Sequence, residues 1–88
     1  MAVVDACRAK LQPTLVAFRA SHPSGVFSAK RTIDPLLDLW SLAVAVDSTV
    51  ARPIETVLVA LAERPVVTST ELSTCTDRVE AALAQLSA

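Results

Sequence analysis

Glycine is almost absent from this sequence, in which Gly25 is the only one among 88 residues. Loops that cradle phosphate groups, such as the dinucleotide-binding and P-loop signatures, need two or three glycines at close spacing. The chain therefore lacks the signatures of these nucleotide-binding sites.

Aromatic residues are also scarce, because tyrosine is missing and only Phe18, Phe27 and Trp40 are present. Since 52% of the residues are nonetheless hydrophobic, the core has to be built from alanine, valine and leucine. That composition is typical of helical bundles. The length suits one small core, so the sequence predicts a single all-α domain over residues 1–88.

Few residues could carry chemistry. His22 is the only histidine, and its place between serine and proline indicates an exposed loop. Cys7 and Cys75 both fall on apolar helix faces, where a free, buried cysteine behaves as a small hydrophobic residue. Two distant thiols with one histidine make no zinc signature. We therefore expect a non-enzymatic protein with no catalytic site, metal site or cofactor.

No charge of one sign dominates, because the formal net charge is −1. This balance is untypical of proteins that bind nucleic acid or anionic membranes. The most hydrophobic stretch, residues 36–46, is shorter than the roughly 20 residues of a membrane span. No secretory signal is visible, so we expect a soluble cytoplasmic protein. Arginine outnumbers lysine six to two, a bias associated with GC-rich bacterial genomes.

The first predicted helix spans residues 2–20. Pro13 removes one of its backbone hydrogen bonds and is expected to kink or break it. Residues 21–25 are rich in turn-forming types and predict a loop. The apolar residues of the helix recur at intervals of three and four, which places them on one face: Val4, Cys7, Leu11, Leu15 and Phe18.

The second predicted helix begins with Asp34 as its N-cap and Pro35 at its first position, and its body covers residues 36–50. Its apolar residues point in nearly every direction, so a chain this small can hardly cover them all. Pro53 then opens a third helix or kinks a longer one, and Pro65 ends it.

The fourth helix has the clearest start. Thr68 and Glu71 form a capping box, and Val67 and Leu72 form the hydrophobic staple around it. No internal repeat is visible along the chain.

The last two predicted helices superficially resemble the start of a winged helix-turn-helix domain, over residues 55–86. The segment departs from that family because it has no glycine at the turn. Its helix in the recognition position carries Asp77 and Glu80 against a lone Arg78. The resemblance implies DNA binding, and these acids oppose it.

Two functions follow as expectations. The first is an interaction module that self-associates, as a homodimer or larger oligomer, or docks on a larger protein. The alternative is a degenerate helix-turn-helix regulator that contacts DNA through the basic residues around the first loop. The predicted interaction residues are Leu36, Leu39, Trp40 and Val44 on the second helix, together with the basic residues Arg19, Lys30 and Arg31.

Overall fold

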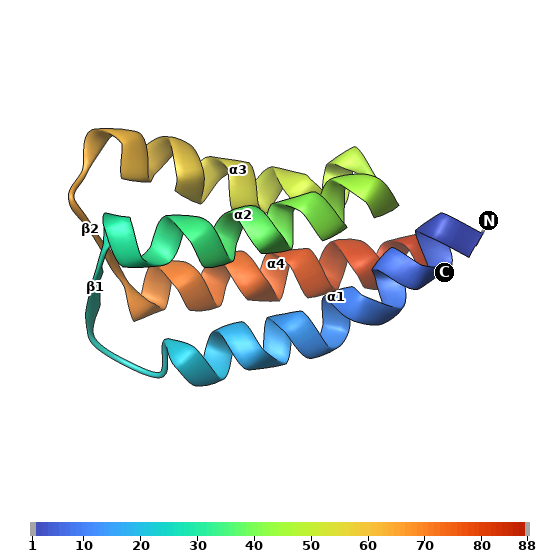
Figure 1. Ribbon diagram of the computed structural model, residues 1–88, viewed down its shortest axis with the longest axis horizontal. Coiled ribbons are helices and arrows are strands. Elements are labelled where there is room, and N and C mark those ends of the chain that lie inside the picture. The colour runs from blue at the N-terminus through green and yellow to red at the C-terminus, as the bar shows by residue number, and fades with distance from the viewer. Residues whose placement is uncertain (1, 88) are drawn as a thin grey trace.

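The computed structural model describes residues 2–87, with side chains described for residues 5–86 (Figure 1). The helices run alternately up and down in a body of 38 × 22 × 19 Å. This confirms the predicted all-α bundle of four helices. The elements are α1 (Ala2–Ser21), β1 (Val26–Ser28), α2 (Ala29–Val46), α3 (Ser48–Glu63), β2 (Val66–Thr68) and α4 (Ser69–Ser87).

Each helix turns one face toward a shared core. Buried positions recur at intervals of three and four, which is the spacing of one side of an α-helix. The predicted face of α1 is confirmed at Leu11, Leu15 and Phe18, whereas Val4 lies outside the described side chains. The other helices contribute Leu36, Leu39 and Ala43 from α2, Val50, Ala51, Ile54, Val57 and Leu61 from α3, and Leu72, Cys75, Val79 and Leu83 from α4.

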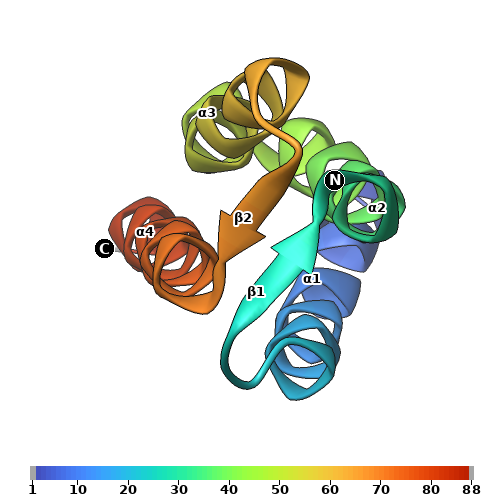
Figure 2. The ribbon, with the colours of Figure 1, turned by 90° about the vertical axis from the view of Figure 1, so that its left-hand side faces the viewer.

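Two short strands cross one end of the bundle, and the sequence did not predict them (Figure 2). β1 and β2 pair antiparallel, with Phe27 opposite Val67 at the centre of the register. Each strand has only three residues, which is too few for an alternating pattern to be recognised. The pair ties the α1–α2 connection to the α3–α4 connection.

The chain contains a structural repeat of helix, strand and helix, because α1–β1–α2 is followed by α3–β2–α4. Two reciprocal hydrogen bonds relate the halves: Ala29 N donates to Pro65 O (2.8 Å), and Ser69 N donates to Gly25 O (2.9 Å). Equivalent residues are forty positions apart. Pro13 and Pro53 are equivalent and identical, as are Val26 and Val66. Most equivalent positions, such as Gly25 and Pro65, hold different residues, so the repeat is not visible in the sequence.

α2 begins earlier than predicted. Its N-cap is Ser28, whose hydroxyl accepts a hydrogen bond from Arg31 N (3.3 Å). The predicted start at Asp34 and Pro35 is wrong, since both residues lie inside the helix. Serine caps helices as well as aspartate does, and Ser28 is placed for this role by its strand.

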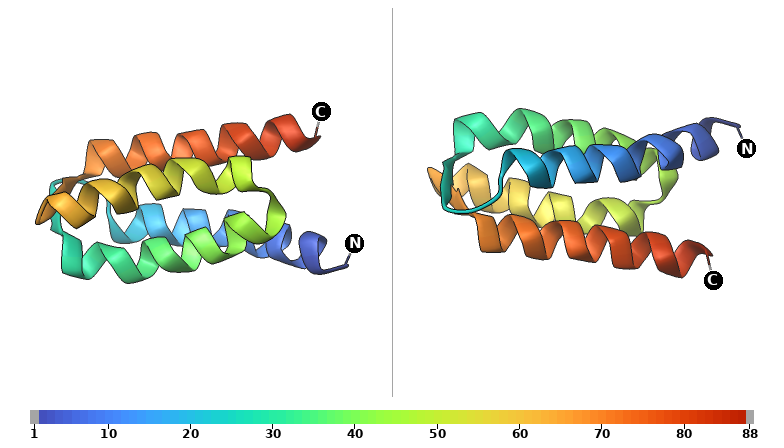
Figure 3. Two further views of the ribbon diagram at one scale, coloured as in Figure 1. Left: turned by 90° about the horizontal axis from the view of Figure 1, so that it is seen from above. Right: turned by 90° about the horizontal axis from the view of Figure 1, so that it is seen from below.

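A tight turn joins α2 to α3 (Figure 3). It consists of a single residue, Asp47. Its carboxylate accepts hydrogen bonds from Thr49 N (2.9 Å) and Thr49 Oγ1 (2.7 Å), which hold the pKa of Asp47 below its usual value. Its N–H donates to Ala43 O (3.0 Å) at the end of α2. The predicted boundary, with α2 reaching Val50 and α3 opening at Pro53, is wrong because Asp47 supplies the cap.

α1 continues as one helix through Pro13, and α3 continues as one helix through Pro53. Neither proline breaks its helix, and a kink at either position stays a prediction. Each proline lacks the N–H that would bond the carbonyl four residues earlier. Packing of the helical faces outweighs that loss.

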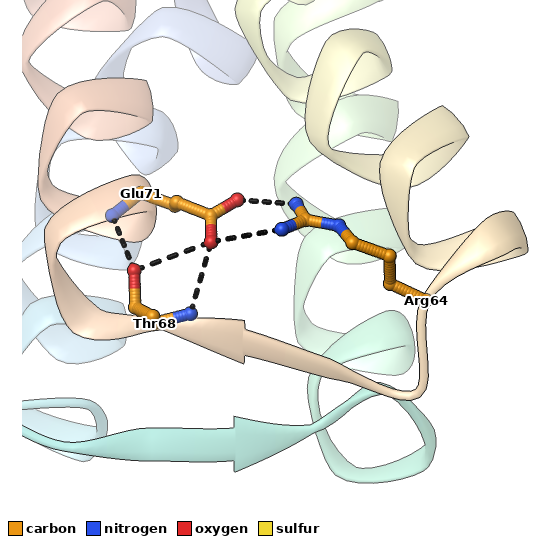
Figure 4. Close-up of polar contacts among 3 residues, drawn as sticks. All are labelled: Arg64, Thr68 and Glu71. Carbon is orange, nitrogen blue, oxygen red and sulfur yellow. Dashed lines mark hydrogen bonds and ion pairs between the residues drawn. The ribbon is translucent and has the colours of Figure 1, made fainter.

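The predicted capping box at the start of α4 is confirmed (Figure 4). Glu71 N donates to Thr68 Oγ1 (3.2 Å), and Thr68 N donates to Glu71 Oε1 (3.4 Å). Arg64, just beyond the end of α3, forms an ion pair with the same carboxylate. The Arg64 guanidinium lowers the pKa of Glu71, and the Thr68 hydrogen bonds lower it further.

Candidate interaction surface

An apolar strip runs along the α3-facing flank of α2. Four residues spaced by four, three and four positions share this helical face: Ile33, Leu37, Trp40 and Val44. We name this set, together with Leu58 and Val59 of α3, the α2–α3 strip.

A hydrogen bond fixes how the strip is oriented. The Trp40 indole N–H donates to Glu55 Oε2 (2.8 Å), so this face of α2 is turned toward α3. Leu58 and Val59 lie one helical turn beyond Glu55 and therefore share its side of α3. The strip thus spans two neighbouring helices.

Three members of the strip keep much of their surface in solvent. Leu37 is 42% exposed, Val44 is 40% exposed and Val59 is 64% exposed. The remaining members are partly buried against the core, so the strip has a fixed base with exposed apolar edges. Other exposed apolar side chains lie on other elements: Val16 on α1, Val26 and Val66 on the strands, and Leu86 on α4.

The predicted apolar contact residues divide between the strip and the core. Trp40 and Val44 belong to the strip, whereas Leu36 and Leu39 are fully buried within the chain itself. Since Leu36 and Leu39 have no surface to offer, we leave them out of the interaction surface. Leu37 and Val59, which the sequence did not single out, are exposed on the same strip, and seeing this requires knowing which flank of α2 meets α3.

The predicted basic residues also divide into two groups. Arg19 Nε donates to Thr76 Oγ1 (2.9 Å), and its guanidinium pairs with Asp77 (2.6 Å) and Glu80 (3.2 Å). Its charge is therefore balanced by α4. Lys30 and Arg31 are exposed in the first turn of α2, and their side chains form no ion pair with the described residues.

His22 is buried, so the expectation of an exposed loop residue is wrong. It is only 7% exposed, and its ring stacks on Phe18 (centroids 4.4 Å apart) and meets Phe27 edge-on (4.7 Å). Its Nδ1 lies 3.0 Å from Phe18 O, the acceptor for an Nδ1–H donor. The ring therefore closes the last turn of α1. The sequence did contain one indication of this burial, because Phe18 lies one helical turn before His22.

A cleft of about 370 Å³ lies between the end of α1 and the first half of α4. Arg19 and His22 line it from one side, and hydroxyl residues line it from the other. His22 Nε2 is buried and has no hydrogen-bond partner among the described residues. His22 Nε2 is therefore hydrogen-bonded to none of the described hydroxyls of the cleft. The hydroxyl residues are Ser69, Thr70, Ser73, Thr74 and Thr76.

The cysteines are both free, Cys7 being partly exposed and Cys75 buried. Burial raises the pKa of Cys75 to about 11, so this thiol is protonated near neutral pH and is a poor nucleophile. Over residues 2–87, no three His, Cys, Asp or Glu side chains are grouped to hold a metal ion. None of the described helices is both long enough and apolar enough to cross a membrane.

No protein-family model, curated protein or solved structure matches this chain. Function is therefore inferred from its own side chains and surfaces.

Proposed function

We propose that this chain is a non-enzymatic interaction module that self-associates through the α2–α3 strip. The observation that carries the proposal is the alignment of Leu37, Val44 and Val59 along one seam between two helices, each at least 40% exposed. Exposed apolar residues scattered singly are ordinary, whereas a contiguous row is typical of a protein contact.

A second copy of the chain suits this surface because it presents the same strip. In a twofold dimer the same patch is used on both subunits, so the exposed edges of Leu37 and Val59 would be covered by apolar atoms. Trp40, already anchored to Glu55 by 2.8 Å, gives the contact a rigid aromatic base. The alternative binding partner for the same surface is a larger protein with a matching apolar groove.

The test is the solution mass, measured by light scattering after size exclusion. We expect the unmodified chain to be a dimer or larger, and Val44→Glu with Val59→Glu to be monomeric. Val16→Glu is the matched control, because Val16 is 63% exposed but lies on α1 away from the strip. A dimer of closed bundles that survives the double substitution would exclude the strip, and a monomeric unmodified chain would turn the search to a different protein partner.

The DNA-binding alternative has less support. Arg19 is balanced by Asp77 and Glu80. Among the described residues, this leaves Lys30 and Arg31 as the cations near the first loop that form no ion pair. Binding of duplex DNA at low salt, lost steeply as salt rises, would favour that alternative. We also propose that the interaction module is cytoplasmic, since two free thiols suit a reducing compartment.

A further inference from the structure

We propose that two copies of this chain can exchange halves around Asp47, with α2 and α3 of each copy joined into one continuous helix. In the exchanged dimer, α1–β1–α2 of one copy packs against α3–β2–α4 of the other. This goes beyond the proposed function, because association through the α2–α3 strip joins closed bundles that keep their own halves together.

The hinge is unusually short. Antiparallel helices in bundles are commonly joined by about two to eight residues, whereas here Asp47 stands alone between Val46 and Ser48. Its backbone is extended, with φ −168° and ψ 145°, and its carboxylate is engaged with Thr49. Short hinges invite exchange, because the closed form has to turn the chain within very little length.

The buried face keeps its helical phase across this hinge. In α2 the core positions end with Leu39 and Ala43, and in α3 they resume with Val50 and Ile54. The step from Ala43 to Val50 is seven residues, close to two helical turns. A single helix over residues 29–63 would therefore carry one continuous apolar face, and straightening Asp47 would cost no core position.

The two halves complete each other. The strand pair joins Phe27 to Val67, and Trp40 bonds to Glu55. Both contacts link a residue before Asp47 to a residue after it. In the exchanged dimer, each half therefore finds the same partner residues in the other copy. The repeated order of helix, strand and helix places the two halves symmetrically around the hinge. The strand pair and the hydrogen bond from Trp40 to Glu55 survive the exchange, whereas the Asp47 cap on Thr49 is lost when the hinge opens.

Substitution at the hinge tests this directly. Asp47→Ala removes the cap that favours the closed turn and introduces the best helix former. We expect the monomer–dimer equilibrium to shift toward the dimer by about fivefold for each hinge. Asp34→Ala, which removes an exposed carboxylate from inside α2, should leave the equilibrium unchanged. Insertion of three flexible residues after Asp47 should abolish the exchanged form.

A disulfide across the strands identifies which dimer is present. Ser28 lies opposite Val66 in the register, so Ser28→Cys with Val66→Cys, in a chain carrying Cys7→Ser and Cys75→Ala, would place two thiols side by side. After oxidation of the dimer fraction of the Asp47→Ala chain, exchanged copies become a covalent dimer on a non-reducing gel. A band of monomer size alone would overturn the exchange.

The same gel separates this inference from the proposed function. Closed bundles held through the α2–α3 strip would scatter light as dimers yet give only the monomer band. Adding Val44→Glu and Val59→Glu should abolish that association and leave the covalent dimer, since these side chains are exposed rather than part of the exchanged core.

Discussion

Cys75 lies in the core of α4 with 3% of its surface exposed, and burial raises its pKa from 9.0 to about 11. The folded chain therefore keeps this proton at pH values where the unfolded chain releases it. Since the unfolded state then binds fewer protons, the free energy of unfolding falls as pH rises from 9.0 toward about 11. Below 9.0 this contribution is fully present.

The measurement is urea denaturation across that pH range. We expect a steeper loss of stability for the unmodified chain than for Cys75→Ala, with Cys7→Ala behaving like the unmodified chain. Equal slopes in all three would show that the Cys75 thiol ionises freely in the folded state. Alkylation should agree, with partly exposed Cys7 modified before buried Cys75.

His22 shows what the sequence could and could not reveal about single residues. Its neighbours correctly indicated the end of a helix, but its burial depends on Phe27, which arrives from the following strand. The strip shows the same limit. Trp40 and Val44 were proposed from the apolar residues of the second helix, whereas the exposure of Val59 on the side of α3 that meets Trp40 depends on how α3 packs against α2. Helical periodicity names a face, and tertiary packing decides which flank of it stays exposed.

Among the helices, α4 has the start that is fixed by the most specific side-chain contacts. Glu71 is bound by Arg64 and Thr68, and its pKa lies below the usual 4.5. A carboxylate with a lowered pKa stabilises the fold above its unfolded pKa, and this stabilisation is lost as pH falls through the folded value. Glu71→Gln should therefore lower the free energy of unfolding at pH 7, and this loss should shrink as pH falls below 4.5.

Glutamine can still complete a capping box, so this substitution isolates the charge. Glu63→Gln is the control, because Glu63 is exposed at the end of α3. Thermal unfolding followed by circular dichroism gives both comparisons. A loss for Glu71→Gln that stays equally large as pH falls from 7 into the acid range would show that hydrogen-bond geometry, and not the ion pair with Arg64, stabilises the start of α4.

Local signals predicted one helix boundary correctly and another wrongly. The Thr68 and Glu71 box sits within four residues, and its helix begins where expected. Asp34 with Pro35 gave an equally local signal that was wrong, because Ser28 is brought to the start of α2 by pairing of β1 with β2. Strand pairing across forty residues leaves no mark on a local pattern.

At the scale of the whole molecule, the repeat explains why the two strands exist. Each half ends its first helix, forms three residues of strand and starts its second helix. The strands satisfy each other across a pseudo-twofold axis, with reciprocal hydrogen bonds from Ala29 to Pro65 and from Ser69 to Gly25. Neither half has a partner for its strand alone, so the fold is a pairing of two similar units.

This symmetry predicts that the order of the halves along the chain can be reversed. The start of α1 and the end of α4 lie at the same end of the bundle as the α2–α3 turn (Figure 1). A circular permutant that begins at Asp47, passes through a flexible linker between the original ends and closes at Val46 keeps the Asp47 cap on Thr49. The strand pair and the hydrogen bond from Trp40 to Glu55 are retained, so we expect the same helix content and cooperative unfolding by circular dichroism.

The control permutant begins at Leu39, which is fully buried in the middle of α2. It cuts a helix and its core face, so we expect it to unfold at lower temperature or not to fold. If the permutant opened at Asp47 fails as badly, the short α2–α3 turn is essential to the fold and the halves are not equivalent units. If it folds, it also lacks the hinge that joins α2 to α3. It should then show no exchanged dimer. That result would show that the fold needs the pairing of its two halves but not the hinge, whereas the exchanged dimer needs both.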